Sequence, residues 1–192
     1  MWPWEHAAVG YIVYSLLSRS TTRTPPGDAT ALAVVFGTQF PDLVDKPLAW
    51  WLAVLPAGRS LAHSALVAFP LVTAALLSAA VLGRTELGVA FGIGYLTHLP
   101  ADVLYPALVG EGPDFAFLLY PLVEREPYDG PPLIERVTEL VGEFGAFLGT
   151  PRGAAYLLGE LLLVGVAVAL WTLDGMPVLG AFRRRVRRVI PV

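Results

Sequence analysis

Three long apolar runs are the feature that most constrains the fold of this 192-residue chain. The runs Leu61–Leu82, Leu87–Val109 and Gly153–Leu173 each come close to the ~20 residues that an α-helix needs to cross a hydrocarbon core about 30 Å thick. Hydrophobic residues make up 55% of the chain and charged residues only 15%, which is unusual for a soluble domain. The pattern therefore predicts a polytopic membrane protein.

Further helices are predicted from shorter patterns. The apolar runs Trp4–Leu17 and Ala29–Phe40 fall below the usual spanning length and indicate buried, tilted or interfacial helices. The stretch 42–59 holds proline and two tryptophans and is typical of a short surface or re-entrant helix. Residues 131–148 show apolar side chains at helical spacing, which indicates an amphipathic helix outside the bilayer. The predicted fold class is all-α, a polytopic membrane bundle of about five embedded helices with one extramembrane amphipathic helix.

The chain divides into three predicted segments. Residues 1–109 form a helical membrane core that carries every leading ligand candidate. Residues 110–150 form an acidic extramembrane segment with the amphipathic helix. Residues 151–192 form a final transmembrane helix and a basic cytoplasmic tail.

Arginines beside the apolar runs predict the orientation in the membrane. Arg19, Arg23, Arg84 and the arginines of 183–188 fit the cytoplasmic side, where basic residues gather. With the N-terminus outside, about five crossings place these arginines inside and the acidic segment 110–150 outside. We therefore expect a protein of the inner (cytoplasmic) membrane of a prokaryote, with its C-terminus cytoplasmic. The arginines of 183–188 directly follow a span, so we interpret them as a lipid-facing anchor and expect no nucleic-acid binding.

The chain has three histidines, and each stands in or beside an apolar run where an unpaired polar ring is costly. Under the predicted topology, His6, His63 and His98 all fall near the outer ends of the helices. Asp42 and Asp102 fall there too, and Asp102 follows His98 by four residues, so both share one helix face. Imidazoles with carboxylates, in a chain without cysteine, suit a divalent ion such as Zn, Mn or Fe.

Other acids are weaker candidates, and each has a simpler alternative. Asp42 and Asp45 are predicted to lie in a turn that follows the run Ala29–Phe40, and Asp45 is a further candidate ligand. Glu111 and Asp114 are candidates too, with solvated loop acids as the alternative. Glu160 lies inside the last apolar run, either hydrogen-bonded to another helix or acting as a partner or general base of the site. For any one histidine or Pro-Asp pair, a hydrogen-bonded core residue or a turn remains the alternative.

Four segments resemble, in order, the YdjM-like family of prokaryotic membrane-bound, metal-dependent hydrolases: Glu5–Tyr11, Gly37–Asp45, Arg59–Ser64 and Tyr95–Asp102. They lie in the first 109 residues, the predicted core. The same order looks like the helical metal core of the zinc-dependent phospholipase C and single-strand nuclease superfamily. The resemblance implies the metal ligands His6, Asp42, His63, His98 and Asp102.

The resemblance also implies a reaction, in which a metal-bound water attacks a phosphoester. This chain departs from both patterns. The YdjM-like family often has a histidine where Gly58 stands here, and the phospholipases have further histidines that this chain lacks. We therefore expect fewer ions than the full cluster of those enzymes.

The sequence favours a membrane-embedded metal-dependent hydrolase that acts at the outer membrane edge on a lipid or phosphoester. Two other classes stay open, because buried His and Asp residues also mark ion paths in transporters and a non-catalytic scaffold can keep a structural metal. A closed four-ligand shell favours the scaffold, and an open coordination position favours a catalyst. The expected partners are membrane lipid and the substrate.

Overall fold

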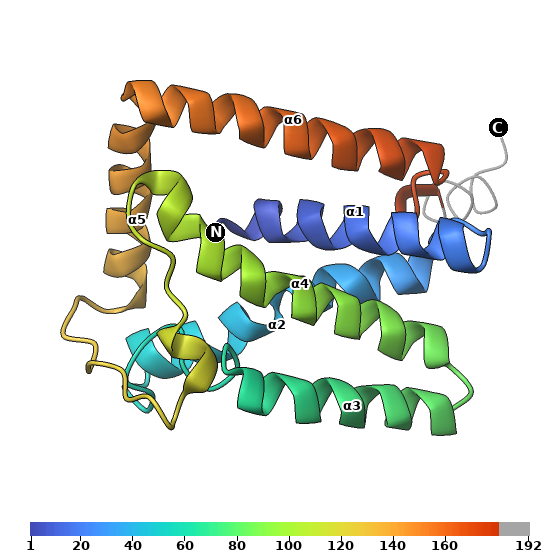
Figure 1. The fold of residues 1–192 in the computed structure, drawn as a ribbon, viewed down its shortest axis with the longest axis horizontal. Helices are drawn as coiled ribbons and strands as arrows, with labels where there is room; N and C mark the ends of the chain where they lie inside the picture. Colours follow the sequence, from blue (N-terminus) through green and yellow to red (C-terminus); the bar gives the residue numbers. More distant parts are fainter. Residues whose placement is uncertain (181–192) are drawn as a thin grey trace, which may run out of the picture.

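The computed structural model describes residues 1–180, and every regular element in this range is helical. The elements are α1 (Pro3–Thr21), α2 (Asp28–Trp50), α3 (Ala65–Val81), α4 (Thr85–Val109), the 3-10 helix η1 (Ala116–Leu119), α5 (Leu133–Leu148) and α6 (Pro151–Leu173). The helices α1, α2, α3, α4 and α6 run side by side, whereas α5 lies across one end of the bundle (Figure 1). The all-α class is confirmed. The arginines of 183–188 lie outside the described residues.

Residues with strong end preferences set several helix boundaries. Pro151 opens α6 behind Thr150, whose hydroxyl accepts a hydrogen bond from the N–H of Gly153. Ser64 caps the start of α3 in the same way. Gly110 ends α4 with φ at 112°, a backbone conformation that favours glycine.

Within residues 1–180, only α4 and α6 are both long and apolar enough to cross a membrane, fewer than the five embedded helices predicted. The helix α3 is apolar but has 17 residues. The helices α1 and α2 are longer, but they carry polar residues that reduce their hydropathy. Among these Ser15, Thr30 and Thr38 are buried inside the bundle, while Leu17 and Phe36 on the same helices are exposed. These inward-facing polar side chains account for part of the lower hydropathy of α1 and α2.

The predicted break after Phe40 is wrong, because α2 continues to Trp50 with Pro41 and Pro47 inside it. A proline removes one backbone donor, but a packed helix can persist when neighbouring groups hold it in place. Asp42 therefore lies within a helix, and the separate short helix predicted in 42–59 does not form there. The apolar run Leu61–Leu82 shows the opposite error, since residues 61–64 form a turn and α3 begins only at Ala65.

Glycines allow α2 and α4 to cross at close range. A Cβ at Gly94 would lie 2.2 Å from the carbonyl oxygen of Val34, and a Cβ at Gly37 would lie 2.3 Å from a carbonyl oxygen of α4. Any larger side chain at these positions would push the two backbones apart. His98 lies one turn after Gly94, and Asp42 lies just over one turn after Gly37. The close crossing therefore brings these two residues together.

A polar network joins the far end of α6 to α1. The carboxylate of Asp174, just after α6, accepts hydrogen bonds from the Tyr11 hydroxyl at 2.8 Å and the Ser15 hydroxyl at 2.7 Å. Its other oxygen accepts a hydrogen bond from Arg19 Nε at 2.8 Å. We call these four residues the Asp174 latch. It fixes α6 to the bundle although most of that helix is exposed.

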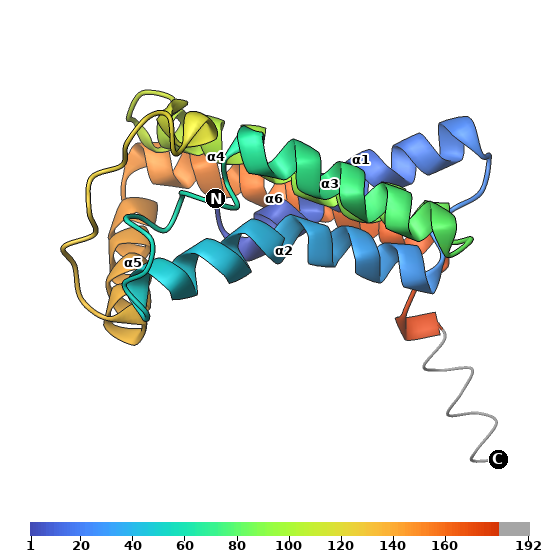
Figure 2. The same ribbon diagram turned by 90° about the horizontal axis from the view of Figure 1, so that it is seen from below.

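At the opposite end, α6 meets the beginning of α1 through two further hydrogen bonds. The Tyr156 hydroxyl donates to the buried Glu5, and the Trp4 indole N–H donates to Glu160. Glu160 thus makes a hydrogen bond to another helix, the simpler of its two predicted interpretations. Figure 2 shows α5 at this same end, beside the ends of α2 and α6.

Candidate metal centre

Four of the predicted ligands converge at the α5 end of the bundle. Asp42 of α2, His63 in the turn before α3, and His98 and Asp102 of α4 each offer one ligand atom, and these atoms lie within 4.8 Å of one another. All four residues are buried. We call them the metal group. Glu111 is exposed, and Asp114 pairs with arginines, so neither loop acid belongs to the group.

The spacing within the metal group fits one ion. His63 Nε2 lies 3.1 Å from His98 Nε2, 3.4 Å from Asp42 Oδ1 and 3.5 Å from Asp102 Oδ2. His98 Nε2 lies 3.6 Å from Asp102 Oδ2, so the helical pair keeps a common face although Pro100 stands between its members. Ligand atoms around a tetrahedral zinc, with bonds near 2.0–2.1 Å, are about 3.4 Å apart.

Each imidazole of the metal group is oriented by a hydrogen bond at its other nitrogen. His63 Nδ1 lies 2.8 Å from Asp45 Oδ2, and His98 Nδ1 lies 2.6 Å from the carbonyl oxygen of Thr38. Metal-binding histidines usually donate their second N–H to a carboxylate or carbonyl in this way. With Nδ1 as the donor, each neutral ring presents its Nε2 lone pair to the centre of the group. Two such lone pairs and two carboxylates can bind one cation at this point, although the Met1 ammonium lies 2.6 Å from Asp102 Oδ1 and Lys46 Nζ lies 2.7 Å from Asp42 Oδ2.

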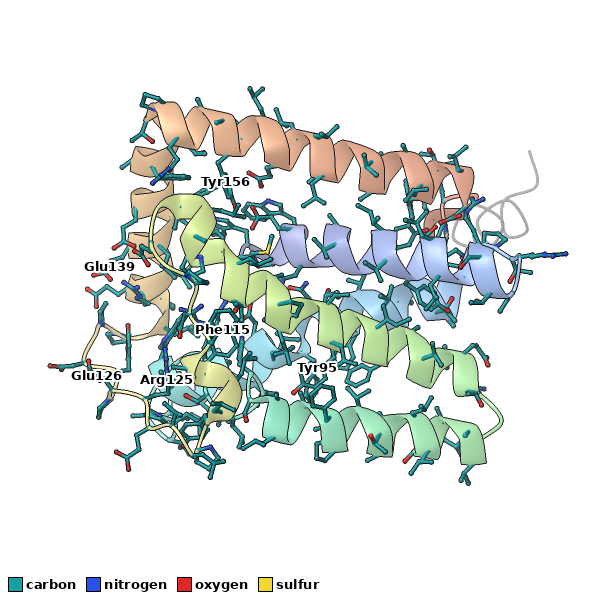
Figure 3. All side chains as sticks on the ribbon, viewed as in Figure 1. Tyr95, Phe115, Arg125, Glu126, Glu139 and Tyr156 are labelled. Atoms are coloured by element: carbon teal, nitrogen blue, oxygen red, sulfur yellow. The ribbon has the colours of Figure 1, made fainter. Side chains whose placement is uncertain are left out.

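Asp45 shapes the segment that carries His63. Its wholly buried carboxylate accepts hydrogen bonds from the backbone N–H groups of Ser60 at 2.8 Å, Ala62 at 2.9 Å and His63 at 3.1 Å. Tyr95, which lies between α3 and α4 in Figure 3, donates its hydroxyl to the carbonyl oxygen of Ala62 at 2.6 Å. Asp45 lies outside the metal group, and its oxygens hold this turn in place.

His6 lies against the metal group without being one of its four members. Its ring stacks on that of His98 with centroids 3.7 Å apart, and its Nε2 lies 3.2 Å from Asp102 Oδ1. Within residues 1–180, the two ring nitrogens of His6 have no hydrogen-bond partner. The two carboxylate oxygens of Asp42 have none either, although Lys46 Nζ forms an ion pair with Asp42 Oδ2 at 2.7 Å. Buried polar atoms without hydrogen bonds are costly. A bound cation would remove that cost, so the residues present fit a metal ion.

The electrostatics around His63 also favour positive charge. His63 lies in the connection before α3, outside the helices. Burial lowers the pKa of its imidazole. The carboxylates of Asp102, Asp42 and Asp45 raise the pKa by more than burial lowers it, so that it is about 10. Without a metal ion the three acids keep this ring protonated near neutral pH, and a metal ion bound to Nε2 would take the place of that proton.

Several residues that frame the metal group carry no strong sequence signal. Thr38 contributes only its backbone carbonyl, which any residue could supply. Phe117 is wholly buried and packs edge-on against His63, with centroids 5.9 Å apart. Lys46 and Arg59 lie at the rim, and their side chains are 29% and 31% exposed. Their spacing gave some signal, since each lies four residues from a member of the metal group.

The fold and the site together define an all-helical protein with a buried histidine–aspartate group at one end of its bundle. The family model described as YdjM inner membrane protein matches residues 1–176. The chain belongs to this family. The match extends through the acidic segment and α6, beyond the part of the chain that carried the resemblance. No curated protein and no solved structure matches the chain, so the likeness to the phospholipase C and nuclease superfamily has no support from these comparisons.

Proposed function

We propose that this protein is a membrane-embedded, metal-dependent hydrolase of lipid or other phosphoester substrates, with zinc as the leading metal and manganese or iron as alternatives. The observation that carries the proposal is the convergence of two oriented imidazoles and two carboxylates beside buried atoms of His6 and Asp42 that lack hydrogen bonds. Such a nitrogen and oxygen donor set suits these ions. A divalent ion bound there supplies an activated water and polarises a phosphoryl oxygen.

The residues around the metal group have distinct tasks in this proposal. Asp42, His63, His98 and Asp102 hold the ion, and Asp45 fixes the tautomer and direction of His63. His6 contacts the second oxygen of Asp102 and is the candidate for an additional ligand. Lys46 and Arg59 are partly exposed at the rim of the metal group, and we propose that the substrate enters on this side.

We further propose that α1, α2, α3, α4 and α6, which run side by side, sit in the inner membrane as one bundle, with the metal group at the outer edge. Arg19 lies in the last turn of α1, Arg23 follows that helix, and Arg84 lies between α3 and α4, all at the end of the bundle away from α5 (Figure 1). Basic residues favour the cytoplasmic side, which puts the N-terminus and the acidic α5 region outside. The polar residues of α1 and α2 then face the interior of the bundle.

A structural metal in a non-catalytic scaffold is the second candidate, and one observation favours it. The metal group already supplies four buried protein ligands, the number that closes a tetrahedral structural zinc site. An ion-transport path is less well supported, because the histidines and candidate carboxylates gather at one end of the bundle, and an apolar cluster that includes Tyr14, Ala31, Val34 and Ala90 packs around the latch residue Tyr11.

Hydrolysis by purified protein tests the proposal against the scaffold. Detergent-purified wild-type protein reconstituted with zinc or manganese is assayed with bis(p-nitrophenyl) phosphate and with a fluorescent phospholipid. We expect turnover that a chelator abolishes and that His63→Ala lacks, while Asp174→Asn, which alters the distant latch, retains it. X-ray absorption at the metal edge should show at least one solvent oxygen on the ion. Stoichiometric metal with only protein ligands and no turnover would favour the scaffold.

A further inference from the structure

Next to the metal group, two arginines share one carboxylate. Arg59 Nη2 lies 3.5 Å from Asp114 Oδ2, and Arg125 Nη2 lies 3.2 Å from the same oxygen. Figure 3 shows Arg125 at the α5 end of the molecule, where the metal group also lies. Two guanidinium charges against one carboxylate leave this trio with net positive charge. A cationic trio beside a cation site is suited to an anion that contacts both.

Arg59 differs from Arg125 because it reaches the metal group. Its Nη1 donates to the backbone carbonyl of Asp102 at 3.3 Å, and its guanidinium lies over the buried Phe117 ring, 5.3 Å from the centroid. The turn that follows Arg59 is fixed by the hydrogen bonds to Asp45. Arg59 is therefore held with one edge at Asp102 and the other at Asp114, while 31% of the side chain stays exposed.

The contact between Arg59 and Asp114 is weak enough to be exchanged. Charge-assisted N–H···O bonds are usually about 2.7–2.9 Å long, and this contact is 3.5 Å. A guanidinium presents a planar fork of N–H donors that matches a phosphate group with two parallel hydrogen bonds. A phosphate that replaced Asp114 would form better hydrogen bonds than those it displaced.

We infer that Arg59 forms an anion subsite beside the metal group that binds the phosphate group of the substrate, and that Asp114 contacts this guanidinium when no phosphate is bound. The inference rests on the proposed function, because it specifies the substrate class of the same site. Asp114 then acts as a competing carboxylate, and Arg125 keeps that carboxylate in place from the other side. A lipid headgroup and a soluble phosphoester carry the same recognised chemistry.

Phosphate titration of the zinc-loaded, detergent-purified full chain tests this inference. Inorganic phosphate is titrated calorimetrically at fixed ionic strength into wild type, Arg59→Gln, Arg59→Lys, Asp114→Asn and Arg125→Gln, and the metal content of each sample is measured. We expect Arg59→Gln to weaken phosphate binding roughly tenfold to a hundredfold, as for the loss of hydrogen bonds to a charged group. The phosphate affinity of Arg59→Lys should lie between those of wild type and Arg59→Gln, because lysine keeps the charge but lacks the planar pair of N–H donors.

Asp114→Asn should tighten phosphate binding, and the matched control Arg125→Gln should change it by no more than about threefold. All variants should retain the metal content of wild type. Unchanged phosphate affinity in Arg59→Gln, an equal loss in Arg125→Gln, or no phosphate binding by metal-loaded wild type would overturn the inference. Loss of metal from Arg59→Gln would also overturn it, in favour of a structural role. Wild type without metal would instead contradict the proposed function.

A second arm separates the two sources of phosphate. Binding of glycerol 3-phosphate is compared with binding of phosphatidic acid in mixed micelles, in wild type and Arg59→Gln. A lipid substrate predicts Arg59-dependent binding that is stronger for phosphatidic acid. A soluble substrate predicts Arg59-dependent binding of similar strength for both. Binding of either ligand that does not depend on Arg59 contradicts the subsite.

Discussion

Two buried polar clusters lie at opposite ends of the helical bundle, and they differ in how their polar atoms are satisfied. In the Asp174 latch, hydroxyl and guanidinium donors meet carboxylate acceptors at 2.5–2.8 Å. In the metal group, ring nitrogens and carboxylate oxygens face one another across 3.1–3.9 Å. The atoms of His6 and Asp42 there have no hydrogen-bond partner within residues 1–180.

The difference distinguishes a structural contact from a binding site. Buried polar side chains without partners are costly, so each cluster needs compensation. The latch finds its compensation within the protein, in the pairing of Asp174 with Arg19 and two hydroxyl groups. In the metal group, the Met1 ammonium and Lys46 pair with Asp102 and Asp42, and a bound cation would compensate the ring nitrogens and carboxylate oxygens that face the centre. Substitutions at the two ends should therefore have different consequences.

The largest effect on folding is expected where α2 and α4 cross. Gly94→Ala places a Cβ 2.2 Å from the carbonyl oxygen of Val34, and the backbones must separate. We expect the free energy of unfolding to fall by about 3 kcal/mol or more, at the upper end for overpacked cores, together with loss of bound metal. Denaturant-induced unfolding in detergent measures the first and elemental analysis the second. Gly159→Ala is the matched control, since nothing lies within 4 Å of its Cβ. Equal stability of the two variants would show that the close crossing does not position the site.

A smaller loss of stability is expected in the latch. Asp174→Asn removes the charge that pairs with Arg19 and leaves buried hydroxyl donors with a poorer acceptor. Breaking a buried pair costs about 3–5 kcal/mol, but Arg19 is 39% exposed, so we expect about 2–3 kcal/mol. The same unfolding assay measures this change. Metal content should stay at the wild-type level, and a parallel loss of metal would mean that the two ends are not independent.

The smallest effect is expected at the residue that orients a ligand. Asp45→Asn keeps one acceptor oxygen but loses the second and the charge that holds the His63 ring. Removal of such orienting partners typically weakens metal binding by roughly tenfold to a hundredfold, or about 1.4–2.7 kcal/mol. Competition with a chelating dye gives the zinc Kd. An unchanged Kd would show that the hydrogen bond to Asp45 does not control His63.

Much of the fold could be predicted from residue patterns. The apolar runs located α4 and α6, and helical spacing located α5. The path of α2 could not be predicted, because Pro41 and Pro47 are strong local signals for a break and only packing against α4 overrides them. The number of membrane-crossing helices could not be predicted either. Buried polar residues such as Thr38 lower the hydropathy of α2, although several of its exposed side chains are apolar.

Part of the candidate site was also predictable from residue spacing and motifs. His98 and Asp102 share a helix face by spacing alone, and the ordered motifs pointed to Asp42 and His63. The part played by Asp45 was not predictable, because its partners are backbone N–H groups of a turn fifteen or more residues away. Every residue except proline has a backbone N–H group, so the amino-acid sequence does not show which residues Asp45 contacts.

Elemental analysis of detergent-purified protein tests the central claim most directly. Wild type, His63→Ala, Asp102→Ala and the latch variant Asp174→Asn are purified without added metal and analysed for zinc, manganese and iron. The account predicts near-stoichiometric metal in wild type and in Asp174→Asn, and loss of most of it in both variants of the metal group. Metal content that is the same in His63→Ala and Asp102→Ala as in wild type would contradict it.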